Sequence, residues 1–250
     1  HIINGNIEIP IININITEES KENELFLKPR LIYNDPFRVK GSYLALCDIF
    51  DVNGDPYKYN LRYKLISTLD NPEKITKLHP VLYFKQEYIL KDISRPKKWS
   101  YEIINNKLKY LAEKHYLYCM ETKMNIDGYE IKNNKVTYTI GPNGIIGICD
   151  DIWLSRYILR RLLQNEDYSI EYNGKLIMNY SDNNTKKENG IKEINKYIKN
   201  MKKKGEKKNN IIISPQTKLF KKGTFEDKRY DSNTDPYYIL QTFSENVYKN

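Results

Sequence analysis

Residues 136–163 read VTYTIGPNGIIGICDDIWLSRYILRRLL, and this stretch decides the fold because it joins a strand pattern to a helix pattern. Residues 136–140 alternate between apolar and polar side chains, as strands with one buried face do. Residues 150–163 place apolar side chains at helical spacing, and Asp150 and Asp151 suit the first turn of a helix. The side chains predicted to line that helix are Ile152, Trp153, Tyr157, Ile158 and Leu162.

Similar patterns extend outward from this stretch in both directions. Strand patterns occupy residues 7–16, 42–51 and 81–90, and helix patterns occupy residues 107–120 and about 185–198. The sequence Asn-Gly-Asp-Pro at residues 53–56 predicts a hairpin turn. Strands and helices do not alternate regularly, so the sequence predicts an α+β fold rather than repeated βαβ units.

The composition indicates a globular protein with one sizeable core, or one core and a small additional domain. The chain has 250 residues, of which 40% are hydrophobic. No apolar run approaches the roughly 18 to 20 residues that span a bilayer, so we expect no membrane. Cys47, Cys119 and Cys149 are too scattered for a disulfide framework. We interpret them as buried thiols in a reducing compartment and expect a cytoplasmic protein.

The positive charge gives weak support for a nucleic-acid partner. The net charge is +9 and the pI is about 9.1, but six lysines lie within residues 199–208 alone. No aromatic side chains are interspersed in that tract as stacking platforms for bases. A solvated surface is therefore the favoured interpretation of the lysine tract.

Eight segments, in the same order along the chain, resemble segments of glutamine synthetase of the eukaryotic, decameric type. They are residues 34–38, 46–49, 59–62, 86–88, 140–142, 151–159, 187–190 and 222–229. The resemblance implies an N-terminal β-grasp domain followed by a catalytic domain with an open, curved sheet flanked by helices. It also implies that the chain begins partway through the first domain. We expect a β-grasp remnant at residues 1–59 and the catalytic domain at residues 60–250.

The resemblance implies a particular chemistry and the residues that would perform it. Glutamine synthetase activates glutamate with ATP and Mg or Mn, and ammonia then attacks the acyl phosphate. Hard divalent cations require several converging carboxylates. Glu87, Glu130 and Glu226 match metal-binding positions, and Lys228 matches an arginine that binds glutamate.

Other positions that match the family's site carry different residues. Lys85 and Thr137 stand where the resemblance implies metal-binding glutamates, and Asn15 stands where it implies an aspartate that binds ammonium. Ile212 and Pro215 replace arginines that contact nucleotide and substrate. A loop with a metal-binding histidine and the flap over the site have no counterpart. The ammonium of Lys85 would lie about where a cation belongs and would repel it.

The residues alone also allow a structural interpretation of the remaining polar side chains. Glu87, Glu130 and Glu226 could pair with Lys85, Lys135 or Lys228 as polar core groups rather than bind metal. Two histidines are also interpreted as structural. His115 fits a helix face inside the core, and His79 precedes a proline at a strand entry.

Three functions remain open from the sequence. The first is a pseudoenzyme with a structural, storage or regulatory role and no cofactor. The second is a weakly active glutamate–ammonia ligase that uses ATP with Mg or Mn, and the third is a basic nucleic-acid-binding protein. The resemblance implies a homo-oligomer, a decamer of two pentameric rings, and we expect its interface to include residues 9–16.

Overall fold

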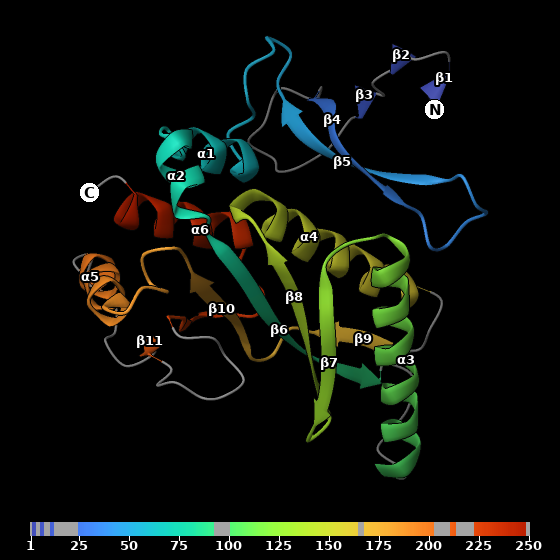
Figure 1. Ribbon diagram of the computed structural model, residues 1–250. Helices are drawn as coiled ribbons and strands as arrows, with labels where there is room; N and C mark the ends of the chain where they lie inside the picture. Colours follow the sequence, from blue (N-terminus) through green and yellow to red (C-terminus); the bar gives the residue numbers. More distant parts are fainter. Residues whose placement is uncertain are drawn as a thin grey trace.

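The computed structural model describes residues 2–3, 6–7, 11–12, 25–92, 101–164, 168–202, 211–213 and 223–248. Its largest unit is a seven-stranded antiparallel sheet in the order β11-β12-β10-β6-β8-β7, with β9 paired to β6 (Figure 1). The strands are β6 (Val81–Asp92), β7 (Ile126–Lys132), β8 (Lys135–Asn143), β9 (Tyr168–Glu171), β10 (Lys175–Ser181), β11 (Ile211–Ile213) and β12 (Phe225–Asp231).

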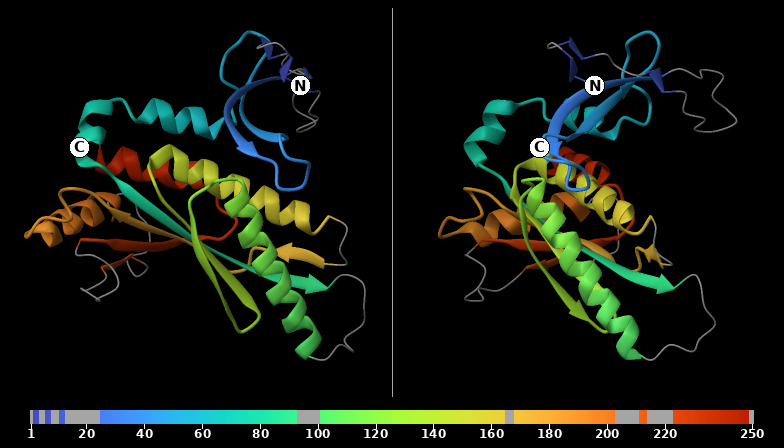
Figure 2. Two further views of the ribbon diagram at one scale, coloured as in Figure 1. Left: turned by 45° about the vertical axis from the view of Figure 1, so that its right-hand side comes forward. Right: turned by 90° about the vertical axis from the view of Figure 1, so that its right-hand side faces the viewer.

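Helices lie to one side of this sheet, some in contact with its strands and others in contact with further helices. They are α1 (Leu61–Thr68), α2 (Pro72–Leu78), α3 (Tyr101–Glu121), α4 (Ile145–Leu162), α5 (Gly190–Lys202) and α6 (Pro236–Val247). α4 packs on β6 and β8, α3 packs on β7, and α6 packs on α1, α4 and α5. Figure 2 shows α3, α4 and α6 along the same side of the sheet. The predicted α+β class, with a curved sheet flanked by helices, is confirmed.

The core lies between this sheet and its helices. Leu82, Phe84 and Tyr88 of β6 are fully buried, as are Ile152 and Ile158 of α4. Burying one large apolar side chain stabilises the fold by roughly 1.5–3 kcal/mol. The alternating pattern of β6 therefore fixes which of its faces is turned toward the helices.

The N-terminal part forms smaller sheets. β1 (Ile2–Ile3) pairs with β2 (Asn6–Ile7), and β3 (Ile11–Ile12), β4 (Leu25–Asn34) and β5 (Tyr43–Phe50) form a three-stranded sheet. Figure 2 shows β4 and β5 on the far side of the helices from the large sheet. The domain boundary between residues 59 and 60 stays a prediction. Most of the expected interface at residues 9–16 lies outside the described residues.

Several predicted elements are confirmed, and others have different bounds. The strands expected at residues 42–51, 81–90 and 136–140 are β5, β6 and β8, and the helix expected at 107–120 is α3. The helix expected from Asp150 begins at Ile145, and the one expected from about residue 185 begins at Gly190. The chain does turn at residues 53–56, with a bridge between Phe50 and Pro56, but α1 follows instead of a second hairpin strand.

Two of the side chains predicted to line α4 are partly exposed. Trp153 is 38% and Tyr157 is 46% exposed. Cys119 and Cys149 are buried as expected, whereas Cys47 is half-buried. Among the described helices, none is both long and apolar enough to cross a bilayer.

Candidate functional site

Strand β6 separates the family-like residues between its two faces. Successive side chains of a strand point to opposite sides of the sheet. Gln86 and Tyr88 are completely buried on the side that the helices cover, whereas Lys85 and Glu87 are half-buried on the other side. We call this second side the site face. Lys85, Glu87, Thr137, Glu130 and Glu226 are the positions on it that the resemblance assigns to metal binding.

Three of these positions form one row across neighbouring strands. Thr137 of β8 lies opposite Glu87 of β6, and on its other side it lies opposite Glu130 of β7. Directly opposite residues of an antiparallel pair have side chains on the same face. The structure therefore brings Glu87 and Glu130 to the same face with the threonine between them. Glu130 is exposed, and within the described residues it makes no ion pair.

Glu226 of β12 forms ion pairs with two lysines. Nζ of Lys85 lies 3.5 Å from its Oε1, and Nζ of Lys228 lies 3.1 Å from its Oε2. The carboxylate is only 15% exposed, so solvent screens these charges less than at an open surface. The two ammonium groups occupy both oxygens that a cation would need.

Glu87 is held by the turn that leads into β10. Its Oε2 accepts a hydrogen bond from the backbone N–H of Lys175 at 2.8 Å, and Nζ of Lys135 lies 3.2 Å away. The turn passes through Gly174, whose φ is +146°. A Cβ atom at Gly174 would lie 2.1 Å from the same carboxylate oxygen. This short turn stands where the resemblance implies a longer loop with a histidine. It lies directly against the Glu87 carboxylate.

The remaining predicted positions give less information. Asn15 and Pro215 lie outside the described residues. Ile212 belongs to β11 and its backbone lies opposite Glu226. In the ranges given above, no group of three His, Cys, Asp or Glu side chains is arranged to hold a metal ion.

Behind β6, a buried arginine joins the sheet to the C-terminal segment. Nε and Nη2 of Arg156 in α4 donate to Oε1 of Gln86 at 3.0 and 2.7 Å. Nη2 also donates to the backbone oxygens of Ser232 and Thr234. Sequence reasoning did not assign this network. Its signal was the presence of Gln86 and Arg156 within otherwise apolar stretches, since buried polar groups need partners.

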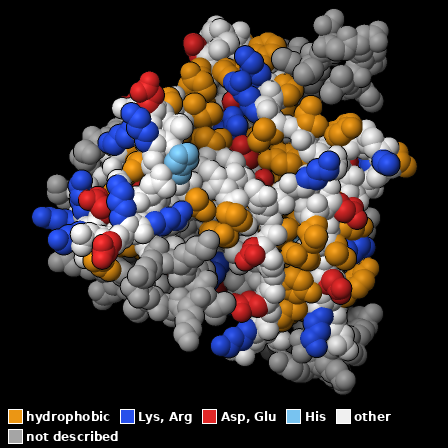
Figure 3. All heavy atoms as spheres, viewed as in Figure 1, with side chains coloured by type: hydrophobic (Ala, Val, Ile, Leu, Met, Phe, Trp, Pro, Cys, Tyr) orange, Lys and Arg blue, Asp and Glu red, His pale blue; other side chains and the backbone are white. Residues whose placement is uncertain are grey.

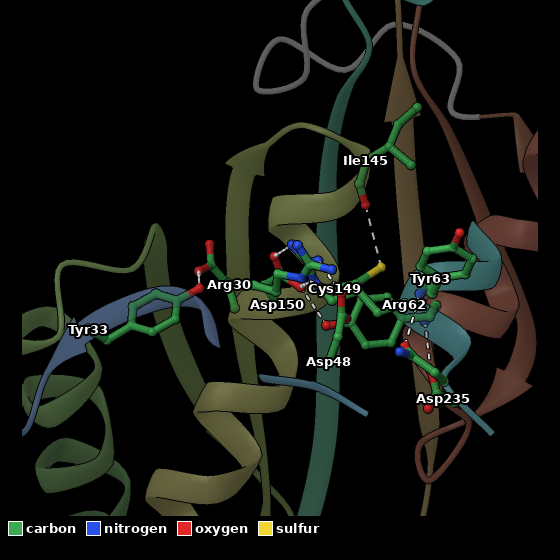
Figure 4. Close-up of polar contacts among 12 residues, drawn as sticks. Arg30, Tyr33, Asp48, Arg62, Tyr63, Ile145, Cys149, Asp150 and Asp235 are labelled. Carbon is green, nitrogen blue, oxygen red and sulfur yellow. Dashed lines mark hydrogen bonds and ion pairs between the residues drawn. The ribbon is translucent and has the colours of Figure 1, made fainter. Parts of the chain in front are cut away.

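A second buried network joins the N-terminal sheet to the helices (Figure 4). Arg62 of α1 donates to both oxygens of Asp150 at 3.0 and 3.2 Å and lies 3.6 Å from Asp48 of β5. Nε of Arg30 in β4 also donates to Asp48, at 2.6 Å. The hydroxyl of Tyr237 donates to Asp150 at 2.5 Å. These residues therefore hold two layers together.

Tyr33 and Asp151 form a further contact between the same layers. The Tyr33 hydroxyl donates to Oδ1 of Asp151 at 3.4 Å, and Asn143 donates to Oδ2 at 2.8 Å. Burial raises the pKa of the Asp151 carboxyl, while the hydrogen bond from Asn143 lowers it. Burial and then the negative charge of Asp151 raise the pKa of Tyr33. Asp151 is thus a buried acceptor inside α4, not a residue of a helix start.

His115 is a core residue, as the sequence predicted. It is 1% exposed, and its Nε2 lies 3.1 Å from both the backbone oxygen and Oγ of Ser155. Its ring meets that of Tyr138 edge-on, with the centroids 4.9 Å apart. Burial lowers the pKa of His115 to about 4. His79 is exposed and ends α2 in a left-handed conformation with a φ of 46°.

Comparisons with known proteins agree with this architecture. No protein-family model matches the sequence. The chain is 25% identical over 285 residues to glutamine synthetase N-1 of Phaseolus vulgaris, covering 90% of this chain and 80% of that protein. It is 24% identical over 284 residues, with the same coverage, to glutamine synthetase cytosolic isozyme 1-5 of Arabidopsis thaliana.

A solved structure shows the same fold. The cryo-EM structure of Plasmodium falciparum glutamine synthetase matches with a TM-score of 0.71 and 12% identity, covering 94% of this chain. The chain spans only 64% of the length of that protein. The fold is thus that of a glutamine synthetase catalytic domain with a small N-terminal sheet. The chain is distantly similar to the glutamine synthetases in sequence and in fold.

Proposed function

We propose that this chain is a glutamine synthetase-like pseudoenzyme, which keeps the fold and assembles with itself but does not carry out the ligase reaction. The observation that carries the proposal is the pairing of Glu226 with Lys85 and Lys228, and of Glu87 with Lys135 and the Lys175 N–H. Carboxylates that bind divalent cations must offer free oxygens to the metal. Both oxygens of Glu226 and Oε2 of Glu87 instead form ion pairs and hydrogen bonds within the protein.

The residues on the site face do not fit ATP with Mg or Mn as the family would use it. A cation at Glu226 would lie within a few ångströms of two ammonium groups, and like charges at that separation repel strongly where water is partly excluded. Thr137 offers a neutral hydroxyl where the resemblance implies a carboxylate. We therefore derive no catalytic step through a metal or a nucleotide.

Self-assembly is supported by the apolar side chains that the N-terminal sheet exposes. Ile32 is 52%, Val39 is 82% and Tyr43 is 57% exposed at one end of the β4–β5 pair. Apolar side chains grouped in this way are typical of surfaces that bind another protein. Figure 3 shows further hydrophobic side chains among charged ones over α3 and β7. We propose a homo-oligomer in the cytoplasm, and a decamer of two pentameric rings is the form that the resemblance implies.

Calorimetric titration tests the proposal that the metal and nucleotide sites are lost. We expect the unmodified protein to bind neither Mn²⁺ nor Mn–ATP up to about millimolar concentrations. It should also release no phosphate from ATP when glutamate and ammonium are added. Phosphate release that depends on all three substrates would show an active ligase and refute the proposal.

The variant Lys85→Glu provides the positive arm of the experiment. It places a carboxylate two residues from Glu87 on the same face, next to Glu226, and removes one competing ammonium. We expect its Mn²⁺ affinity to rise by about tenfold or more over the unmodified protein. Lys192→Glu makes the same charge change at an exposed position of α5 and should leave Mn²⁺ affinity unchanged.

A further inference from the structure

A cavity of about 540 Å³ opens between the C-terminal end of α4 and strand β9. It lies on the side of the sheet that α4 covers, whereas Glu87 and Glu226 lie on the site face. The cavity is therefore separate from the candidate site described above. Its lining consists of Tyr157, Arg160, Arg161, Leu163, Gln164, Tyr168, Ser169, Ile170 and Tyr172.

Three tyrosine rings and two aliphatic side chains give the cavity an apolar body. Tyr168 and Tyr172 come from β9 and the residue after it, and Tyr157 comes from the exposed side of α4. Tyrosine rings offer large, flat apolar surfaces with a polar end. The exposure of Tyr157 leaves its ring available to this cavity.

Two arginines place positive charge at the same cavity. Arg161 donates to Oε1 of Gln164 at 2.5 Å, and its guanidinium lies 5.9 Å from the ring centre of Phe37. Arg160 is exposed, and in the part of the chain that the structure describes it makes no ion pair. Guanidinium groups match the planar geometry of carboxylates and the oxygens of phosphates.

Tyr172 contributes its ring to this cavity, whereas its hydroxyl is buried away from it. The hydroxyl has no hydrogen-bond partner among the described residues. Burial raises the pKa of Tyr172, and the positive charges of Arg156 and Arg160 oppose that rise. The hydroxyl therefore stays neutral, and because it is buried it does not reach a ligand in the cavity.

We propose that this pocket binds a small anionic ligand with an aromatic or otherwise apolar body. The apolar body lies among the rings of Tyr157, Tyr168 and Tyr172, and a carboxylate or phosphate group pairs with Arg160. The cavity volume lies within the range of about 300–1,000 Å³ that is usual for small-molecule sites. The proposal is independent of whether the site face is catalytic.

Three probes of similar size test the proposal by ligand-observed NMR titration of the full chain. They are phenylacetate, phenyl phosphate and the neutral 2-phenylethanol. We expect both anions, or one of them, to bind at least about tenfold more tightly than the alcohol. The order of the two anions identifies whether the pocket prefers a carboxylate or a phosphate, and either order supports the site.

Variants locate the binding. Arg160→Gln should weaken the preferred anion about tenfold, because the exposed side chain can lose its charge without disturbing the core. Lys192→Gln, a neutralisation on α5, should have no effect. Equal affinity in Arg160→Gln and the unmodified protein, or no anion binding up to about 10 mM, would overturn the proposal.

Discussion

Oε2 of Glu87 lies only 2.1 Å from the position that a Cβ atom at Gly174 would take. The glycine is therefore required twice, once by its φ of +146° and once by the carboxylate above it. This contact explains how a short turn can replace a longer loop at this end of β10. A substitution in this turn therefore tests the contact that we describe between the turn and Glu87.

Gly174→Ala should lower the free energy of unfolding by about 2–4 kcal/mol, because the new methyl group both strains the backbone and displaces Glu87. Urea denaturation gives the value. Gly128→Ala is the matched control, since no atom lies within 4 Å of its Cβ position and its φ is ordinary. Adding Glu87→Ala to Gly174→Ala should recover part of the loss. No recovery in the double variant would contradict the proposed contact.

Arg62→Ala should be among the most destabilising changes in the chain. It leaves the carboxylates of Asp48 and Asp150, each 1% exposed, without the guanidinium between them. Removing one partner of a buried ion pair typically costs about 3–5 kcal/mol. Arg38→Ala, at a side chain that is 61% exposed, should cost at most about 1 kcal/mol. Similar losses in both variants would show that the Arg62 network is not a buried support.

Stability should fall as the pH is lowered from about 6.5 to about 4, in part because of His115. Its pKa is about 4 in the fold, below the unfolded value near 6.5, so the unfolded chain takes up a proton that the native state does not. The contribution amounts to roughly 3 kcal/mol over that window. His115→Gln should reduce the pH dependence of the unfolding free energy, whereas the exposed His79→Gln should not. Identical slopes for both variants would refute the assignment.

Light scattering after size-exclusion chromatography tests self-assembly. The unmodified protein should be several times heavier than the 29.8 kDa chain. Ile32→Asp should shift it toward smaller species, because a charge on an exposed apolar strand opposes burial against a partner. Ile191→Asp is a control of equal chemistry, since the two side chains are 52% and 54% exposed. A 29.8 kDa species in the unmodified protein would exclude the homo-oligomer.

The sequence predicted the elements whose patterns are set by burial on one side. Residues 81–90 and 136–140 alternate because the face of each strand toward α4 is part of the core. The helix of residues 107–120 was found for the same reason, although it extends over Tyr101–Glu121. In these segments the local pattern and the tertiary contacts agree, and simple periodicity is then sufficient.

The predicted start of α4 was wrong because tertiary contacts override the local preference for acidic residues in the first turn of a helix. Asp150 and Asp151 look like first-turn acids, but they lie in the helix interior, where Arg62 and Asn143 hold them. α1 and α2 were missed because each has only eight or seven residues. Their capping residues could have indicated them in the sequence. Asn60 and Asn71 both accept hydrogen bonds from backbone N–H groups, and Pro72 stands in the first turn of α2.

The site could be located from the resemblance, but its contacts could not. The sequence offered Lys85, Lys135 and Lys228 as possible partners of three glutamates, without specifying the pairs. Strand register decides them: Lys85 reaches across β10 to Glu226 rather than to its neighbour Glu87. Register depends on turns and bulges far along the chain, which one-dimensional patterns do not encode.

The Arg62 network has a consequence for how the molecule opens. The N-terminal sheet is too small to be stable in isolation, and its separation from α1 would remove the Arg62 guanidinium from Asp48, which would keep Arg30 as its partner. Opening between these layers therefore loses both the Arg62–Asp48 contact and the support of the small sheet, which makes it unfavourable. Local fluctuations will concentrate at the outer strands and turns, while the small sheet, α1 and α4 exchange their amide hydrogens as one cooperative unit.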